Sequence, residues 1–204
     1  MTSKRIARFD FAERANHWMS AILFLYLALT GLALWSRKLY WLAAVFGGGS
    51  VVRAIHPIAG ALFALSLTFM FVRWRSQMSL DADDREWLRQ SSKYATNQEE
   101  GLPESGKFNG GQKMMFWMQW SFGIVLLASG VVLWFPEVMP RTLRLAAVLI
   151  HPLAAVGAIG GIILHIYMGT AAVPGALRSM IRGWVTARWA AAHHPKWHRQ
   201  INNS

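Results

Sequence analysis

The residues best suited to chemistry in this 204-residue chain are its histidines, because the sequence contains no cysteine. Without cysteine there is no disulfide, no thiolate metal site, no iron–sulfur cluster and no covalently attached c-type haem. Of seven histidines, four lie in or at the ends of apolar stretches: His17, His56, His151 and His165. Neutral imidazole is a good iron ligand, and two axial histidines fill both free positions of a haem iron. Such an iron carries electrons and has no site for oxygen.

Four apolar stretches are long enough to hold these histidines within a membrane. A helix needs about 20 mostly apolar residues to cross roughly 30 Å of hydrocarbon. The stretches that meet this length lie at about 17–36, 54–74, 114–135 and 145–172. Hydrophobic residues make up 54% of the chain and charged residues only 15%, against about a quarter charged in ordinary soluble domains. We therefore predict an all-α integral membrane protein, one membrane domain over residues 1–204 built as a four-transmembrane-helix bundle. No internal repeat is evident.

The basic residues predict the orientation of the bundle. The net charge is +11, and 16 of the 21 Lys and Arg residues lie in the N-terminal arm, the segment between the second and third stretches, and the C-terminal tail. Cytoplasmic connections are enriched in Lys and Arg, so both termini, the loop 76–113 and the tail 176–204 are predicted to be cytoplasmic. The 16 residues are Lys4, Arg5, Arg8, Arg14, Arg73, Arg75, Arg85, Arg89, Lys93, Lys107, Lys113, Arg178, Arg182, Arg188, Lys196 and Arg199.

With this orientation the four histidines sort into two pairs by depth. The first stretch runs outward, whereas the second and fourth run back toward the cytoplasm. His151 and His165 are 14 residues apart, which is about 21 Å and just short of four helical turns, so both face nearly the same way. The pattern predicts two stacked b-type haems. His17 and His165 would hold the inner haem iron, and His56 and His151 the outer one.

Small and basic neighbours fit this prediction. Glycines stand four residues after His56 and on both sides of His165, on the same helix face, where they would leave room for a flat macrocycle. These glycines are Gly60, Gly161 and Gly169. Arg14 and Arg53 each precede a predicted ligand by three residues at a water-facing helix end. Each is a candidate partner for a haem propionate.

Other interpretations stay open on the residues alone. Intramembrane histidines also form hydrogen bonds that pack helices together, and they can relay protons or ions in a small transporter. The tail residues His193, His194 and His198 are predicted to be solvated or partner-facing rather than metal ligands. Asp81, at the head of an acidic run, is a candidate start for a short helix.

Several segments carry a resemblance to a known family. The most specific are KFNGGQKMMFW at 107–117 and HHP at 193–195; RANHW at 14–18, RAIHP at 53–57 and HIYM at 165–168 support them. Together with His151, they make nearly the whole chain resemble the cytochrome b (gamma) subunits of membrane-bound respiratory formate dehydrogenases.

The resemblance implies a membrane anchor in a three-subunit complex of the bacterial cytoplasmic membrane. A molybdenum or tungsten (alpha) subunit would oxidise formate outside the membrane, and an iron–sulfur (beta) subunit would pass electrons to the outer haem. The inner haem would deliver them to menaquinone or ubiquinone near the cytoplasmic face, in a pocket using Asn109, Gly111 and Gln112. The chain itself would carry no catalytic centre for formate.

Two alternatives remain beside this implication. The same cytochrome scaffold serves hydrogenases and thiosulfate reductases, and nothing in the outer connections distinguishes these partners. The alternative interpretation of the Asn109 segment is a flexible turn that starts a helix. Gly110 departs from the family pattern and predicts a looser loop there.

Overall fold

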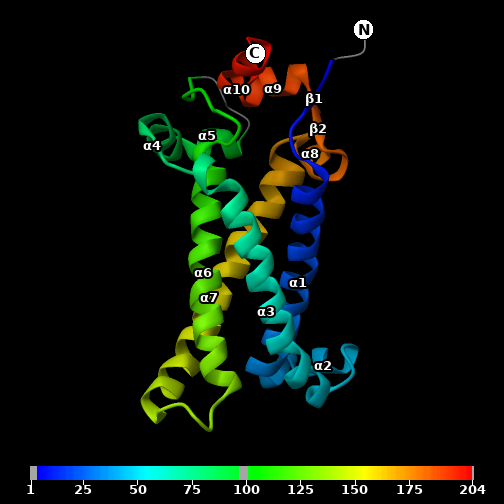
Figure 1. Cartoon of the computed structure of the whole chain (residues 1–204), viewed down its shortest axis with the longest axis vertical. Helices are drawn as coiled ribbons and strands as arrows, with labels where there is room; N and C mark the ends of the chain where they lie inside the picture. The colour runs from blue at the N-terminus through cyan, green and yellow to red at the C-terminus, as the bar shows by residue number, and fades with distance from the viewer. Residues whose placement is uncertain (1–3, 97–100, 204) are drawn as a thin grey trace. The chain divides into compact units, whose positions relative to one another are not determined.

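Four long helices dominate the computed structural model, which describes residues 4–96 and 101–203. They are α1 (Phe11–Trp35), α3 (Gly49–Trp74), α6 (Gly110–Trp134) and α7 (Arg141–Tyr167) (Figure 1). Each is long and apolar enough to cross a membrane, with a mean hydropathy of 1.7 to 2.2 over its most apolar window. The predicted all-α membrane fold with four spans is therefore confirmed.

Two of the long helices, α1 and α6, begin before the apolar stretches because polar residues cap their first turns. At the start of α1, the Asp10 carboxylate accepts from the Glu13 backbone N–H at 2.8 Å, and the Glu13 carboxylate accepts from that of Asp10 at 2.9 Å. Asn109 and Gln112 make the same reciprocal pair at the start of α6. Each pair satisfies two backbone donors that a helix start otherwise leaves without partners.

The chain divides into two compact units. The membrane unit consists of Asn16–Val72 and Met118–Gly161, and the polar unit of Met1–Ala15, Arg73–Trp117 and Ile162–Ser204. All 16 basic residues that carry the orientation argument fall in the polar unit, and the other five fall in the membrane unit. The three basic segments therefore belong to one compact unit, as a common side of the membrane requires.

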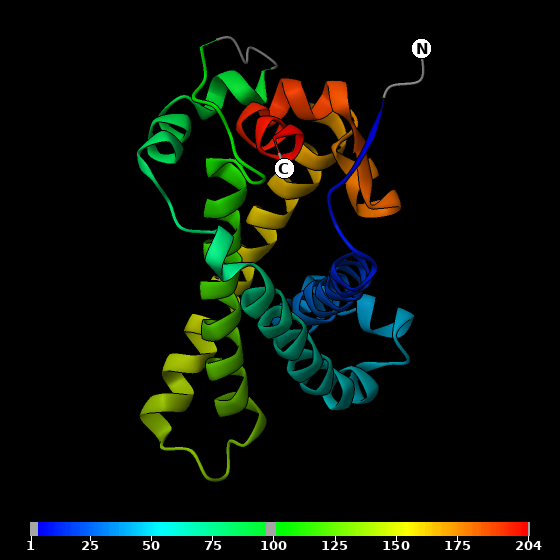
Figure 2. The ribbon, with the colours of Figure 1, turned by 45° about the horizontal axis from the view of Figure 1, so that its top comes forward.

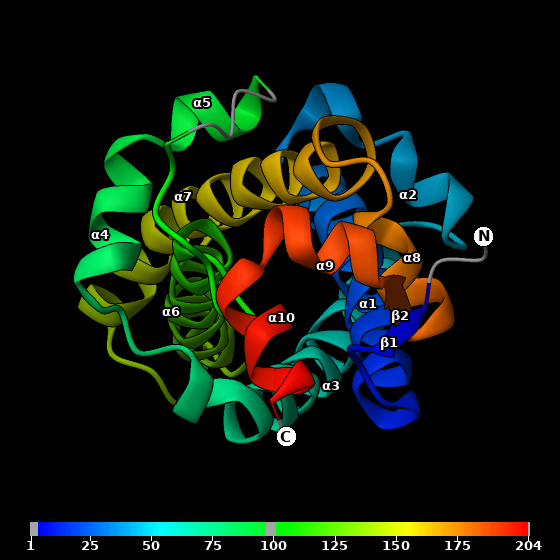
Figure 3. The same ribbon diagram turned by 90° about the horizontal axis from the view of Figure 1, so that it is seen from above.

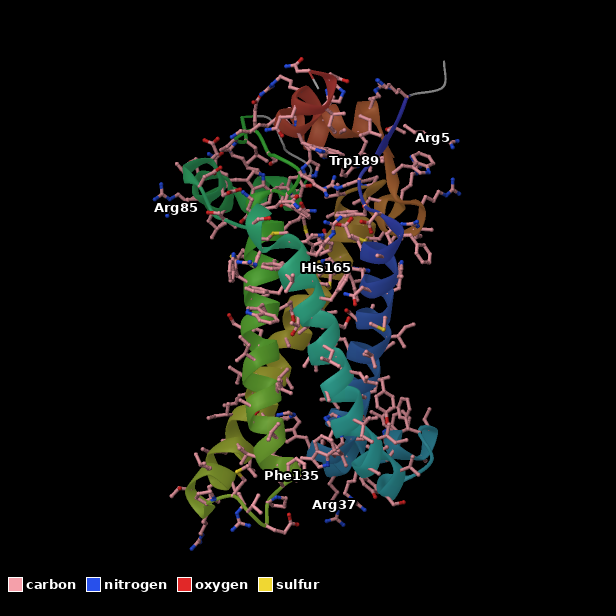
Figure 4. The ribbon with its side chains drawn as sticks, viewed as in Figure 1. Arg5, Arg37, Arg85, Phe135, His165 and Trp189 are labelled. Carbon is pink, nitrogen blue, oxygen red and sulfur yellow. The ribbon has the colours of Figure 1, made fainter. Side chains whose placement is uncertain are left out.

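The membrane unit contains parts of all four long helices, arranged as two hairpins. Residues 36–48, with the short helices η1 (Arg37–Leu39) and α2 (Leu42–Val45), connect α1 to α3. Gly47 and Gly48 have φ values of 89° and 99°, which favour glycine. A short turn joins α6 to α7 (Figure 2). Arg37 and Phe135, labelled in Figure 4, lie at the start of the two connections, within two residues of the ends of α1 and α6.

The polar unit is built from shorter elements. An antiparallel pair of strands, β1 (Arg5–Ala7) and β2 (Trp184–Thr186), joins the N-terminal arm to the tail (Figure 3). The sequence did not predict this pair. The helical elements are η2 (Arg75–Gln77), α4 (Ala82–Arg89), α5 (Ser91–Ala95), η3 (Met168–Ala172), α8 (Ala176–Arg182), α9 (Ala187–His193) and α10 (Pro195–Asn202). Asp81 caps α4, so the predicted start of a short helix is confirmed.

One predicted solvated histidine lies in the core of the polar unit. His194 is 1% exposed, with Nδ1 2.7 Å from the Gly106 carbonyl and Nε2 3.0 Å from Nη2 of Arg8. The guanidinium only donates and the carbonyl only accepts, so His194 is neutral and carries its proton on Nδ1. Burial, with the nearby Arg8 charge, lowers the pKa of His194 well below 6.5. Burial also lowers the pKa of Arg8 to about 10, which leaves it charged at neutral pH.

This arrangement predicts that acid destabilises the polar unit through His194. An unfolded histidine takes up a proton as the pH falls through about 6.5, whereas folded His194 does not. Below that pH the free energy of unfolding should decrease by up to about 1.4 kcal/mol per pH unit. Thermal unfolding of the wild type and of His194→Gln, between about pH 7.5 and about pH 5, measures this. Gln keeps a donor and an acceptor without titrating, so its stability should depend less on pH; equal slopes would contradict the assignment.

Candidate functional site

The structure brings together the two histidines predicted as the outer pair. His56 on α3 and His151 on α7 both belong to the membrane unit, and their ring centres are 6.4 Å apart with an interplanar angle of 64°. Two imidazole nitrogens bound in line to one metal, each by a bond of about 2 Å, lie about 4 Å apart. Each ring centre lies a ring radius behind its nitrogen. The observed spacing therefore accommodates one metal ion between the two rings.

A hydroxyl group sets the protonation of the first ring. Thr30 Oγ1 on α1 lies 2.8 Å from Nδ1 of His56 and donates its own proton to the Tyr26 carbonyl at 2.7 Å. Because a hydroxyl has a single proton, Thr30 must accept from Nδ1–H of His56. The Nε2 atom of His56 then carries the lone pair that a metal needs.

The second ring has the same arrangement on the other hairpin. Ser129 Oγ on α6 lies 2.9 Å from Nδ1 of His151 and donates to the Val125 carbonyl at 2.6 Å. The proton of His151 is therefore also on Nδ1, and its Nε2 is the atom left for a metal. Ligating histidines commonly have their second ring nitrogen bonded in this way, which fixes the ring and strengthens the ligand.

The number of available ligands favours haem over a bare ion. Within residues 4–96 and 101–203, no group of three or more His, Cys, Asp or Glu side chains could hold a metal. A site with only two protein ligands needs further ligands from elsewhere. A porphyrin supplies four nitrogens in a plane and leaves two axial positions for imidazoles. The His56 and His151 pair therefore fits the predicted haem.

Two glycines that the sequence analysis did not select hold the rings close to their neighbouring helices. A Cβ placed on Gly31 of α1 would lie 3.4 Å from Cε1 of His56, and one on Gly130 of α6 would lie 3.3 Å from Cε1 of His151. Each glycine therefore lets an imidazole approach the backbone of the helix that also orients it. The sequence signal was a hydroxyl residue followed by glycine in two apolar helices.

The glycines that were predicted to clear room for a macrocycle behave differently from one another. A Cβ on Gly60 or Gly169 would meet nothing within 4 Å, so both positions have open space. A Cβ on Gly161 would lie 2.5 Å from Nε2 of Gln119. The prediction that Gly161 leaves room for a macrocycle is thus wrong, because side chains of α6 fill the space beside it. Its lack of a side chain instead permits close packing of α6 and α7.

The predicted inner ligands lie in different units. His17 lies on α1 in the membrane unit, with its ring edge-on to Trp18 at a centre distance of 5.5 Å. His165 lies on α7 in the polar unit, two residues before that helix ends (Figure 4). The π-helical turn η3 follows directly, and such turns often occur at functional sites. Joint binding of one iron by His17 and His165 stays a prediction.

The two arginines selected as propionate partners have different surroundings. Arg14 donates from Nη1 to the Ile181 carbonyl at 2.8 Å and from Nε to the Asp10 carbonyl at 3.2 Å. It therefore ties the start of α1 to the end of α8 within the polar unit. Arg53 is exposed on α3. A propionate contact stays a prediction for both.

The predicted quinone segment is an ordered helix cap. Asn109 is 2% exposed, and its Oδ1 accepts from the Gln112 backbone N–H at 2.9 Å. Oε1 of Gln112 accepts from the Asn109 backbone N–H at 3.1 Å. Both amide oxygens are therefore committed to the backbone. The groups that remain for a ligand are amide N–H donors, which suit a carbonyl oxygen.

Close packing around this cap contradicts the expectation of a looser loop. Gly110 is the first residue of α6, and a Cβ there would lie 2.6 Å from the backbone oxygen of Asp84. A Cβ on Gly111 would lie 2.8 Å from the Trp87 ring. The nearly buried pair of Lys113 and Asp84, 2.5 Å apart, holds α4 against the start of α6. Glycine at 110 is needed for this contact and does not loosen the segment.

Comparison with known proteins gives consistent matches over nearly the whole chain. The family model described as prokaryotic cytochrome b561 matches residues 8–183. The cytochrome b556(Fdn) subunit of nitrate-inducible formate dehydrogenase from Escherichia coli (strain K12) is 38% identical, covering 99% of this chain and 94% of the relative. The cytochrome b556(fdo) subunit of formate dehydrogenase from the same strain is 36% identical, covering 98% and 94%. A formate dehydrogenase cytochrome b556 subunit from Haemophilus influenzae is 32% identical, covering 96% and 83%.

Proposed function

This chain belongs to the prokaryotic cytochrome b561 family, and we propose that it is the di-haem cytochrome b subunit of a membrane-bound formate dehydrogenase. In this role it anchors the complex and passes electrons from the iron–sulfur subunit to a quinone. The similarity of the chain to formate dehydrogenase cytochrome b556 subunits over nearly its full length supports the choice of complex.

The single observation that carries the proposal is the pair of tautomer-fixed imidazoles in the membrane unit. His56 and His151 have ring centres 6.4 Å apart, and each Nδ1 is occupied by a hydroxyl. The two Nε2 lone pairs would therefore hold the outer haem. Haem supplies a one-electron couple, and the protein supplies two neutral ligands that leave no position for oxygen.

The inner half of the proposal rests on His17, His165 and the cap of α6. His17 and His165 would hold the second haem. The amide donors of Asn109 and Gln112, on either side of Gly111, would receive a quinone carbonyl. Quinone reduction consumes protons, and a site near the cytoplasmic surface would take them from the cytoplasm.

The topology that we propose follows from the charges. The polar unit contains both described ends of the chain and the three basic segments, which supports placing both termini on the cytoplasmic side of a bacterial inner membrane. The outer haem would then lie near the opposite surface. There it would receive electrons from the iron–sulfur (beta) subunit, after formate oxidation by a molybdenum or tungsten (alpha) subunit.

Removal of the outer ligand tests the haem assignment. We expect His56→Ala to insert in the membrane and to lose one haem per chain, because only His151 remains to hold that iron. Formate-dependent quinone reduction should stop. The measurement is haem content per chain with the reduced absorption spectrum, and His198→Ala in the tail is the matched control. Two haems retained in His56→Ala would contradict the assignment.

Replacement of Asn109 separates a quinone contact from a helix cap. Asp caps helices as well as Asn does, and Asp10 does so on α1, but a carboxylate cannot donate to a quinone carbonyl. We expect Asn109→Asp and Asn109→Ala both to keep two haems and to slow quinone reduction. The decrease should be about threefold to tenfold, the net value of roughly one hydrogen bond. Stopped-flow haem oxidation by a quinone measures this. A wild-type rate of haem oxidation in Asn109→Asp would show that Asn109 acts only as a helix cap.

A further inference from the structure

We infer that Thr30 and Ser129 are positioning residues for the outer haem. The two helical hairpins of the membrane unit are repeats of each other, and these two residues occupy equivalent positions in them. The inference rests on the proposed haem between His56 and His151. Neither hydroxyl would touch the iron. Each would act through the imidazole that it orients.

The hydrogen bonds of the two hydroxyls have a single consistent direction. Each hydroxyl donates to the backbone carbonyl four residues earlier, at 2.7 Å for Thr30 and 2.6 Å for Ser129. Each oxygen is then free only to accept from an imidazole Nδ1–H. When Nδ1–H donates to the hydroxyl oxygen, electron density at Nε2 increases and the imidazole becomes a stronger ligand. The hydroxyls therefore influence both the angle of each ring and its strength as a donor.

The surroundings increase the effect of these bonds. Thr30 is 0% exposed and Ser129 is 8% exposed, so water does not compete for either hydroxyl. A hydrogen bond is electrostatically stronger in such low-dielectric surroundings than in water. Gly31 and Gly130, each directly after a hydroxyl residue, give the two imidazoles the space to reach them.

The matching positions reveal an internal repeat that the sequence analysis missed. Equivalent residues of α1 and α6 are 99 residues apart, and equivalent residues of α3 and α7 are 95 residues apart. The second spacing is smaller because the connection between α6 and α7 is shorter than the one between α1 and α3. Other residues of the helices follow the same spacing as the ligands. In the membrane unit the pairs are Thr30 with Ser129, Gly31 with Gly130, Trp35 with Trp134, His56 with His151, Pro57 with Pro152, and Ala59 with Ala154.

The polar unit contains further pairs of residues that are 99 residues apart. Asp10 and Glu13 form the capping box of α1, and Asn109 and Gln112, each 99 residues later, form that of α6. At these two positions the contacts recur although the residue types differ, since acids in one copy are amides in the other. The same contacts recur around the outer imidazoles, so the two hydroxyls occupy equivalent positions.

Equivalence gives the inference a quantitative consequence. Loss of either hydroxyl should weaken one ligand, make the ferric iron less stable and favour the ferrous form. We expect a threefold to tenfold shift of the reduction equilibrium, which is about 30 to 60 mV upward at 59 mV per tenfold. Thr30→Val and Ser129→Ala should shift the outer haem in the same direction and by similar amounts. The inner haem should keep its potential.

The experiment is a redox titration of the full chain in membranes, followed by absorption and by electron paramagnetic resonance of the low-spin haems. Thr30→Ser keeps the hydroxyl and should behave as the wild type. Thr68→Val is the matched control, because Thr68 on α3 makes the same bond to a carbonyl four residues earlier and is exposed. Haem content per chain is measured in every variant.

The outcomes separate this inference from the proposed function. Upward shifts in Thr30→Val and Ser129→Ala, or loss of only the outer haem in them while Thr30→Ser and Thr68→Val keep it, support the positioning role. Unchanged outer potentials with two haems bound would overturn it and leave the haem assignment intact. Equal loss in Thr30→Ser would also overturn it, because packing rather than the hydroxyl would be responsible. A wild-type chain without haem would overturn the proposed function and the inference together.

Discussion

A histidine inside a membrane must satisfy two ring nitrogens where no water is available. Unpaired polar groups in hydrocarbon cost several kcal/mol, and this constraint decides how the outer site is built. In His56 and His151 one nitrogen donates to a hydroxyl of an adjacent helix, and that hydroxyl in turn uses a backbone carbonyl. The remaining nitrogens are left as lone pairs. A metal between the rings would satisfy both of them at once, so the proposed cofactor and the bundle would stabilise each other.

The polar unit must accommodate many positive charges, and it does so by different contacts. Its many cations are held by backbone carbonyls, aromatic rings and a few carboxylates, as when Arg8 donates to the Lys107 carbonyl and lies 5.0 Å from the Trp189 ring centre. The nearly buried Lys113 is paired there with Asp84. Breaking a buried pair is far more costly than breaking an exposed one. This packing keeps the cap of α6 rigid, which a quinone-binding role for Asn109 would require.

Periodicity and composition predicted the features that depend on many residues at once. The four spans, the grouping of basic segments and the level shared by His56 and His151 follow from length, charge and helical geometry. Contacts between helices were not predictable in this way. Gly161 lies near His165 in sequence, yet Gln119 fills its space. His194 is polar and near the end of the chain, yet Arg8 and Gly106 hold it in a core. Such pairings join residues that are far apart in the chain.

The proposed function requires that this polypeptide holds two haems between imidazoles at two depths. The most direct test is the dithionite-reduced minus oxidised spectrum of the purified wild-type chain, with haem b counted per polypeptide. We expect two b-type haems per chain, both with low-spin bis-imidazole signatures. A colourless preparation, or one haem per chain under conditions that keep cofactors bound, would contradict it.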